Sequence, residues 1–250
     1  MSKHIKTEGI ILRRINLNDA DQILTVLTKD LGKISVMAKS SRRIKSKFCG
    51  KLELFYEVKV TVFQGRNLGY LNESEPINTW GFADSDLRTK SILFYIAELT
   101  NKLIQDEQQI DGVYKLLQET LDHIDHNNEK SELILYAFII KLFGLTGFMA
   151  PWDRCARSNV KLNLTEPLYF DLHNGSVVKS GYNSPADPRL TPPLIKWVSF
   201  MQKYPFAAIT KVAPNKGEKT QVWYMIKMML ENILNYPIKS EEFLGIGCNF

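Results

Sequence analysis

The stretch that decides the fold is residues 33–63, KISVMAKSSRRIKSKFCGKLELFYEVKVTVF. Apolar side chains recur at every second position at both of its ends: Ile34, Val36 and Ala38, then Tyr56, Val58, Val60 and Val62. Alternation with a period of two is typical of strands that bury one face. The residues between the two ends are basic and turn-forming, so the stretch predicts two strands joined by a long cationic loop.

Three further β-rich runs lie on either side of this stretch, at residues 10–15, 22–28 and about 68–71. Turn-forming residues separate them, among them the Gln64-Gly65-Arg66-Asn67 turn. Five short strands within about eighty residues, without a helical pattern, predict a small closed barrel. The OB-fold, a five-stranded barrel, is the leading candidate.

After Trp80 the apolar spacing changes to three and four residues, which predicts helices. Asp84 or Ser85 is expected to cap the first helix, which extends to Leu103. Four more helices are predicted: 110–124, 131–145, 193–204 and 221–234. The helix at 131–145 is apolar nearly all round and should lie at the centre of its bundle.

Residues 150–190 are rich in Pro, Asn, Asp and Gly and predict an irregular insert with one hairpin. The chain is therefore expected to be an α+β protein. Residues 1–80 would form an OB-fold nucleic-acid-binding domain, and residues 81–250 an α-helical domain that contains the insert at about 150–190.

The excess of positive over negative charge lies wholly in the first third of the chain. Residues 1–80 hold 14 Lys/Arg and 8 Asp/Glu, whereas residues 81–250 hold 18 and 19, within a net charge of +5. A basic module joined to a near-neutral one suggests that phosphate contacts belong to the first. The longest apolar run, Leu133 to Ile140, is far shorter than a membrane span, and the N-terminus lacks a secretory signal, so a cytoplasmic protein is expected. Three scattered cysteines (Cys49, Cys155 and Cys248) argue against a disulfide framework.

The strongest candidate for a binding site is the segment from residue 39 to residue 51. It holds six cations and no acidic residue: Lys39, Arg42, Arg43, Lys45, Lys47 and Lys51. Cations at this density repel one another unless a polyanion relieves the repulsion, which favours phosphate binding over a merely solvated loop. Aromatic residues nearby could stack on bases, although a core role is favoured for each of them: Phe48, Phe55, Tyr56 and Phe63.

The motifs of common enzymes are absent from the sequence. It contains no GxxxxGK[ST] phosphate loop, no GxSxG and no HExxH. The carboxylate pairs Asp19/Asp21 and Glu73/Glu75 are better explained by turns and solvated strand edges than by a metal site. We expect a protein that is not an enzyme and needs no cofactor.

The N-terminal sequence IKTEGIILRRINLNDADQILTVLTKDLGKISVMAKSSRR (residues 5–43) resembles the start of the RecO family of DNA repair and recombination mediators. Residues at matching places are Gly9, Asp19, Asp21, Leu24, Thr28, Gly32, Ala38, Lys39, Ser46 and Leu52. The resemblance continues to the C-terminal SEEFL, Ser240 to Leu244. It covers essentially the whole chain and is most specific in residues 5–55.

The resemblance implies an N-terminal OB-fold, a helical second domain, and binding to single- and double-stranded DNA. It also implies annealing of complementary strands, including strands coated by single-strand binding protein (SSB), partnership with RecR, and assistance to RecA loading at gaps. The segment from Lys39 to Lys47 would be part of the DNA surface. The helical domain would supply an apolar pocket for the acidic C-terminal tail of SSB, and the protein would associate with the nucleoid.

The chain departs from the family pattern in the insert, where many members carry a four-cysteine zinc module. Cys155 is retained, but Ser158, Val178 and Gly181 stand at about the places of the other three cysteines. Structural zinc needs four good ligands. We therefore expect a degenerate zinc-finger-like insert that binds no metal.

Two alternative functions fit the same electrostatics. One is an OB-fold RNA-binding protein of translation or ribosome assembly. The other is a non-catalytic interaction scaffold whose basic loop contacts an acidic partner.

Overall fold

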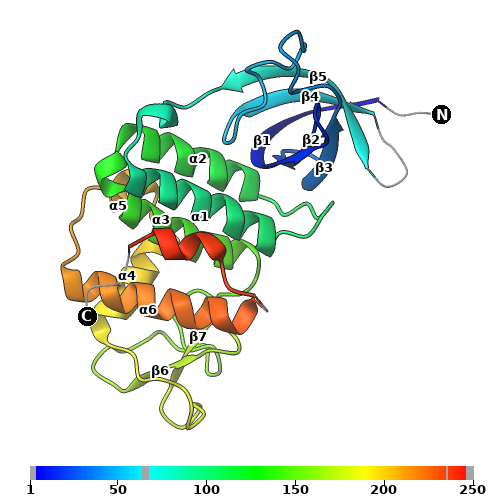
Figure 1. Cartoon of the computed structure of the whole chain (residues 1–250). Helices are drawn as coiled ribbons and strands as arrows, with labels where there is room; N and C mark the ends of the chain where they lie inside the picture. The colour runs from blue at the N-terminus through cyan, green and yellow to red at the C-terminus, as the bar shows by residue number, and fades with distance from the viewer. Residues whose placement is uncertain (1–3, 64–67, 235, 246–250) are drawn as a thin grey trace. The chain divides into compact units, whose positions relative to one another are not determined.

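The structure is a computed structural model that describes residues 4–63, 68–234 and 236–245 (Figure 1). The predicted turn at 64–67 and Cys248 lie outside the described residues. The chain divides into two compact units, Met1–Asp125 and His126–Phe250. The barrel and the first two α-helices belong to the first unit, and the remaining helices and a hairpin belong to the second.

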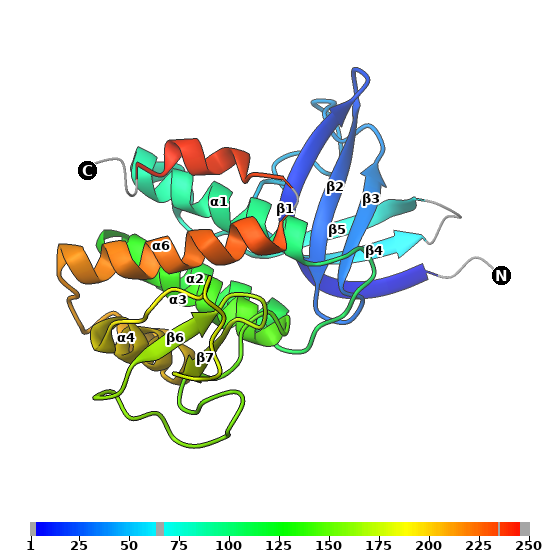
Figure 2. The ribbon, with the colours of Figure 1, turned by 90° about the horizontal axis from the view of Figure 1, so that it is seen from below.

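The first unit begins with the five strands β1 (His4–Leu17), β2 (Asp21–Thr28), β3 (Lys33–Ala38), β4 (Glu57–Phe63) and β5 (Gly69–Asn78). They close into a barrel in the order β1-β2-β3-β5-β4, and Figure 2 shows β1, β2 and β3 side by side. β3 and β5 pair in parallel, through Val36↔Gly69 and Met37↔Tyr70, whereas the other neighbours in the barrel are antiparallel. The predicted OB-fold barrel is confirmed.

Two strands are longer than predicted, because each pairs with different neighbours along its length. β1 pairs with β4 through residues 4–10 and with β2 through residues 9–17, and its register shifts between Ile11 and Arg13. β5 pairs with β4 with register shifts at Glu57/Val58 and Thr61/Val62. Such bulges bend a strand and increase its twist, which helps a short sheet to close on itself.

The barrel interior confirms the alternation predicted from the sequence. Its buried core consists of Ile11, Leu24, Val26, Val36, Ala38, Val58, Val60, Val62 and Leu71 from the strands, with Phe48 and Leu52 from the β3–β4 loop. Burying one such side chain is worth roughly 1.5–3 kcal/mol, so these residues are the main reason that the barrel is stable.

Two helices complete the first unit, α1 (Leu87–Leu103) and α2 (Val113–His126). Asp86 caps α1 by accepting a hydrogen bond from the Thr89 amide at 2.6 Å. The predicted cap at Asp84 or Ser85 is therefore wrong, because Phe82–Asp84 form a short 3₁₀ turn, η1, before the helix. α2 begins three residues later than predicted, after Gly112, whose φ is positive.

Polar contacts fix these helices to the barrel within the first unit. Lys33 is buried, and its Nζ donates to the Asn101 carbonyl at 2.6 Å and lies 3.1 Å from Asp106 Oδ1. Glu57 is also buried and accepts hydrogen bonds from the Tyr114 hydroxyl at 2.6 Å and from Gln118 at 2.8 Å. Burial, together with the hydrogen bond and charge of Glu57, raises the pKa of Tyr114, so its hydroxyl remains a donor at neutral pH.

In the second unit, α3 (Ser131–Leu145) has the bounds predicted from the sequence. It packs against α4 (Pro192–Lys203), α5 (Phe206–Ile209) and α6 (Lys216–Ile233), which confirms its central place. The short α5 was not predicted, and a 3₁₀ turn, η3 (Lys239–Phe243), follows α6. α6 starts five residues earlier than predicted, at a capping box in which Asn215 and Glu218 satisfy each other's backbone amides.

The insert of the second unit contains the predicted hairpin, β6 (Leu168–Asp171) and β7 (Ser176–Lys179). Phe170 is buried beside Trp152, with ring centroids 5.3 Å apart. Cys155 is also buried, and a tight turn follows it in which the Asn159 amide donates to the Cys155 carbonyl. Apolar packing therefore holds the insert together.

No helix in the described part of the chain combines the length and apolar character that crossing a bilayer requires.

Candidate nucleic-acid interface

The six cations of the candidate binding segment all lie on the loop that joins β3 to β4. Residues 39–51 of this loop are called the basic loop here. Its backbone forms consecutive turns, in which the amides of Arg43, Ser46 and Cys49 each donate to the carbonyl three residues earlier. Because this folded loop contains no strand or regular helix, its cations are presented from turns, as the sequence predicted.

Both ends of the basic loop are fixed to the barrel. At the start, the Ser40 amide donates to Asp21 Oδ1 at 2.7 Å, and the Arg42 amide donates to the Ala20 carbonyl at 3.0 Å. At the end, Phe48 and Leu52 are inserted in the barrel core and are only 4% and 3% exposed. The cations between these anchors are held at a defined place on the barrel.

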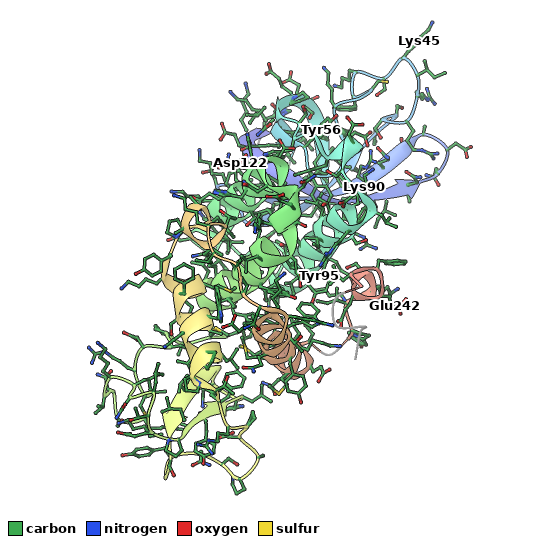
Figure 3. The ribbon with its side chains drawn as sticks, turned by 90° about the vertical axis from the view of Figure 1, so that its left-hand side faces the viewer. Lys45, Tyr56, Lys90, Tyr95, Asp122 and Glu242 are labelled. Carbon is green, nitrogen blue, oxygen red and sulfur yellow. The ribbon has the colours of Figure 1, made fainter. Side chains whose placement is uncertain are left out.

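Every cation of the basic loop is exposed to solvent: Lys39, Arg42, Arg43, Lys45, Lys47 and Lys51. Within the described ranges, none of the six forms an ion pair with a carboxylate. Arg42 donates instead to backbone carbonyls, of Asn18 at 3.1 Å and Asp19 at 3.4 Å. Figure 3 shows Lys45 at the tip of the loop, pointing away from the barrel. The positive charge is thus available to a polyanion.

The aromatic residues near the loop divide into buried and accessible ones. Phe48 and Phe55 belong to the interior, and Phe55 packs edge-on against Phe82 and Phe94. Their core role, favoured from the sequence, is confirmed. Tyr56 and Phe63 are half-buried.

One exposed aromatic residue was missed from the sequence. Tyr70 is 38% exposed, and the ammonium group of Lys39 lies 4.7 Å from the centroid of its ring. The signal that could have found it is parity: Leu71 faces the core, so its neighbour in the strand faces outward.

The insert, expected from the sequence to be a degenerate zinc module, has no set of side chains suited to hold a zinc ion. Of the four positions compared with a zinc module in the sequence, Cys155 and Val178 are buried, and Ser158 and Gly181 offer no thiolate. In the described portion of the chain, no three His, Cys, Asp or Glu side chains are grouped so that they could hold a metal ion.

The closed five-stranded barrel with a helical region after it defines the class of protein: an OB-fold protein with a C-terminal helical part. Two family models match the chain, one over the barrel and one over the helical region. The N-terminal model of recombination protein O matches residues 1–80, and the C-terminal model matches residues 84–242. The chain therefore belongs to the RecO family of DNA repair and recombination proteins.

Individual relatives extend over nearly the whole chain. A DNA repair protein RecO from Caldanaerobacter subterraneus is 25% identical over 243 residues, which cover 96% of this chain and 97% of the relative. One from Dehalococcoides mccartyi is 34% identical over 173 residues, covering 69% of this chain and 68% of the relative. One from Bifidobacterium adolescentis is 24% identical and covers 95% and 97%.

Proposed function

We propose that this chain binds single- and double-stranded DNA through the basic loop and anneals complementary strands, including strands coated by SSB. The observation that carries the proposal is the set of six exposed cations on an OB-fold loop, without carboxylate partners among the described residues. Phosphate contacts from such cations release condensed counterions and supply sequence-independent affinity. Cations that contact both strands lower the repulsion between them, so that complementary bases can pair. This activity makes and breaks no covalent bond, so we propose that the protein is not an enzyme.

The proposed partners rest on membership of the RecO family. The helical region would bind the acidic C-terminal tail of SSB, and RecR would join the complex. Together they would bring the annealing activity to gaps in DNA and promote the loading of RecA there. In the cell, the protein would act in the cytoplasm in association with the nucleoid.

The first test removes the charge of the basic loop through Arg42→Ala, Arg43→Ala, Lys45→Ala and Lys47→Ala in one variant. We expect weaker binding to all DNA sequences alike, because phosphates carry no sequence information. The log–log dependence of affinity on salt should become shallower for each phosphate that is no longer neutralised, by about 0.9 on duplex DNA and about 0.7 on single strands. Fluorescence anisotropy titrations over a range of salt concentrations measure both effects.

A matched control removes four exposed lysines of the second unit: Lys161, Lys196, Lys211 and Lys216. This control lowers the net charge of the chain by the same four units. If both variants lose the same affinity, only the overall charge matters and the loop is not the site. An unchanged salt slope in the loop variant would also contradict the assignment.

Annealing is tested with complementary fluorescent oligonucleotides that are coated with SSB. The wild-type chain should accelerate duplex formation, and the loop variant should not. SSB that lacks its acidic tail separates docking from annealing. With this tailless SSB, annealing of coated strands should slow, whereas annealing of bare strands should keep its rate. Competition between single-stranded DNA and RNA of the same sequence distinguishes this proposal from an RNA-binding role, for which RNA would compete better.

A further inference from the structure

The outside of the barrel carries a row of apolar and aromatic side chains that crosses all five strands. Directly paired residues of neighbouring strands point to the same face of a sheet. The register pairs Ile15 with Ile23, Ile23 with Met37, Met37 with Tyr70, and Tyr70 with Phe63. These five residues are called the outer row here: Ile15, Ile23, Met37, Tyr70 and Phe63.

The outer row faces solvent and not the core. None of its members belongs to the buried cluster inside the barrel. Ile15 and Tyr70 are 39% and 38% exposed, and the other three are half-buried. The neighbouring row of directly paired residues on the same face is polar, namely Arg13, Thr25 and Ser35, of which Thr25 is buried. The apolar character of the outer row therefore does not extend into this neighbouring row.

Positive charge lies at the edge of the outer row. Lys39 directly follows β3 and is the first cation of the basic loop, and its ammonium group lies over the Tyr70 ring at 4.7 Å. An apolar surface beside a cationic loop complements a single strand of nucleic acid. The bases of such a strand present flat faces, and its phosphates are anionic. A duplex offers the same phosphates but keeps its base faces stacked inside. An uncharged apolar partner would leave the adjoining cations unused.

We infer that the outer row is a stacking surface for unpaired bases, with Tyr70 as its main stacking residue, while the phosphates of the same strand run along the basic loop. This inference rests on the proposed function and adds selectivity to it. The basic loop attracts any nucleic acid, whereas the outer row recognises only strands whose bases are unpaired. A strand leaves the outer row when its bases pair, so the duplex product keeps only its contacts with the basic loop.

The test uses the full chain with Tyr70→Ala and Tyr70→Leu, both verified as folded by circular dichroism. Leu keeps apolar bulk on the barrel but has no flat ring. Three probes of equal length are compared: a single-stranded oligonucleotide, its duplex, and a strand of the same length without bases. We expect both variants to bind the single strand about tenfold more weakly, in the range of one stacked base. Binding to the duplex and to the abasic strand should stay at the wild-type level.

Two further variants serve as controls. Tyr70→Phe keeps the ring and should bind the single strand like the wild type. Tyr182→Ala removes an accessible tyrosine from the insert of the second unit and should have no effect. Equal losses on all three probes, or wild-type affinity of Tyr70→Ala for the single strand, would overturn the inference.

The basic-loop variant separates this inference from the proposed function. If that variant loses affinity for all three probes while Tyr70→Ala loses none, the outer row fails and the basic loop stands. If the basic-loop variant keeps wild-type affinity, the proposed site fails. If the wild-type chain binds none of the probes, both fall.

Discussion

Two glycines of the first unit have nearly the same backbone conformation but different surroundings. Gly32, in the turn between β2 and β3, has φ +68°, and Gly50, in the basic loop, has φ +69°. A Cβ on Gly32 would overlap the backbone carbonyl of Gln108, whereas a Cβ on Gly50 would meet no atom within 4 Å. Gly32 thus permits both a left-handed turn and a close approach of the α1–α2 connection, and Gly50 permits only the turn.

Alanine at each glycine should therefore have different costs. Gly50→Ala should lower the free energy of unfolding by about 1 kcal/mol, because an L-residue resists the left-handed conformation. Gly32→Ala should lower it by about 3 kcal/mol, since overlap with the neighbouring backbone adds to the same strain. Urea denaturation monitored by circular dichroism measures both values. Equal losses would show that the close approach at Gly32 has no energetic consequence.

At the level of secondary-structure elements, the start of α1 depends on one carboxylate. The Thr89 amide donates to Asp86, and this hydrogen bond lowers the pKa of Asp86 below the ordinary value of 3.8. Asp86→Ala should destabilise the protein by about 1 kcal/mol at neutral pH. Because the folded state favours the ionised carboxyl, this contribution is present above pH 3.8 and is lost as the pH falls through the lowered pKa.

The measurement is the difference in unfolding free energy between wild type and Asp86→Ala, followed from neutral pH to below pH 3.8. Asn215→Ala, at the cap of α6, provides a comparison with an uncharged capping side chain. The difference should shrink on acidification for Asp86→Ala only. A pH-independent difference would mean that the ionised form of Asp86 has no special role.

The same elements show what local sequence can predict. The apolar run of α3 has its own clear ends, so both bounds were predicted. The first turn of α6 is polar and was missed, although Asn215 followed by Glu218 was the signal of a capping box. The cations of the basic loop were identified because charge is visible in composition. The outer row was not identified, because it depends on register between distant strands and on the irregularity at Thr61/Val62.

For the molecule as a whole, the contacts of Lys33 and Glu57 indicate that the barrel depends for its stability on the helices that follow it. Both charged residues are buried, and their partners Asn101, Tyr114 and Gln118 belong to α1 and α2. Without these helices, the Lys33 ammonium and the Glu57 carboxylate lose their hydrogen-bond partners. A hydrogen bond to a charged group contributes about 1.5–3 kcal/mol to stability, and a barrel without the helices would lack these contributions.

Fragments of the first unit test this dependence. Residues 1–126, which include all of α2, should fold alone into a cooperative unit that keeps the barrel. Residues 1–80, which match the N-terminal family model, should be much less stable, because apolar surface under the helices and both charged groups become exposed. Thermal unfolding and amide dispersion in NMR spectra compare the two. Equal stability would indicate that the barrel is independent of α1 and α2.

The parallel contact between β3 and β5 consists of only two residue pairs and joins segments more than thirty positions apart in the chain. Two pairs offset little of the entropic cost of closing this loop, so this seam should form late in folding and open first in the native state. Met37 and Tyr70 lie on opposite sides of the seam and are neighbours in the outer row. A bound strand that spans both residues therefore selects the closed barrel, and by mass action it tightens the fold at its weakest point.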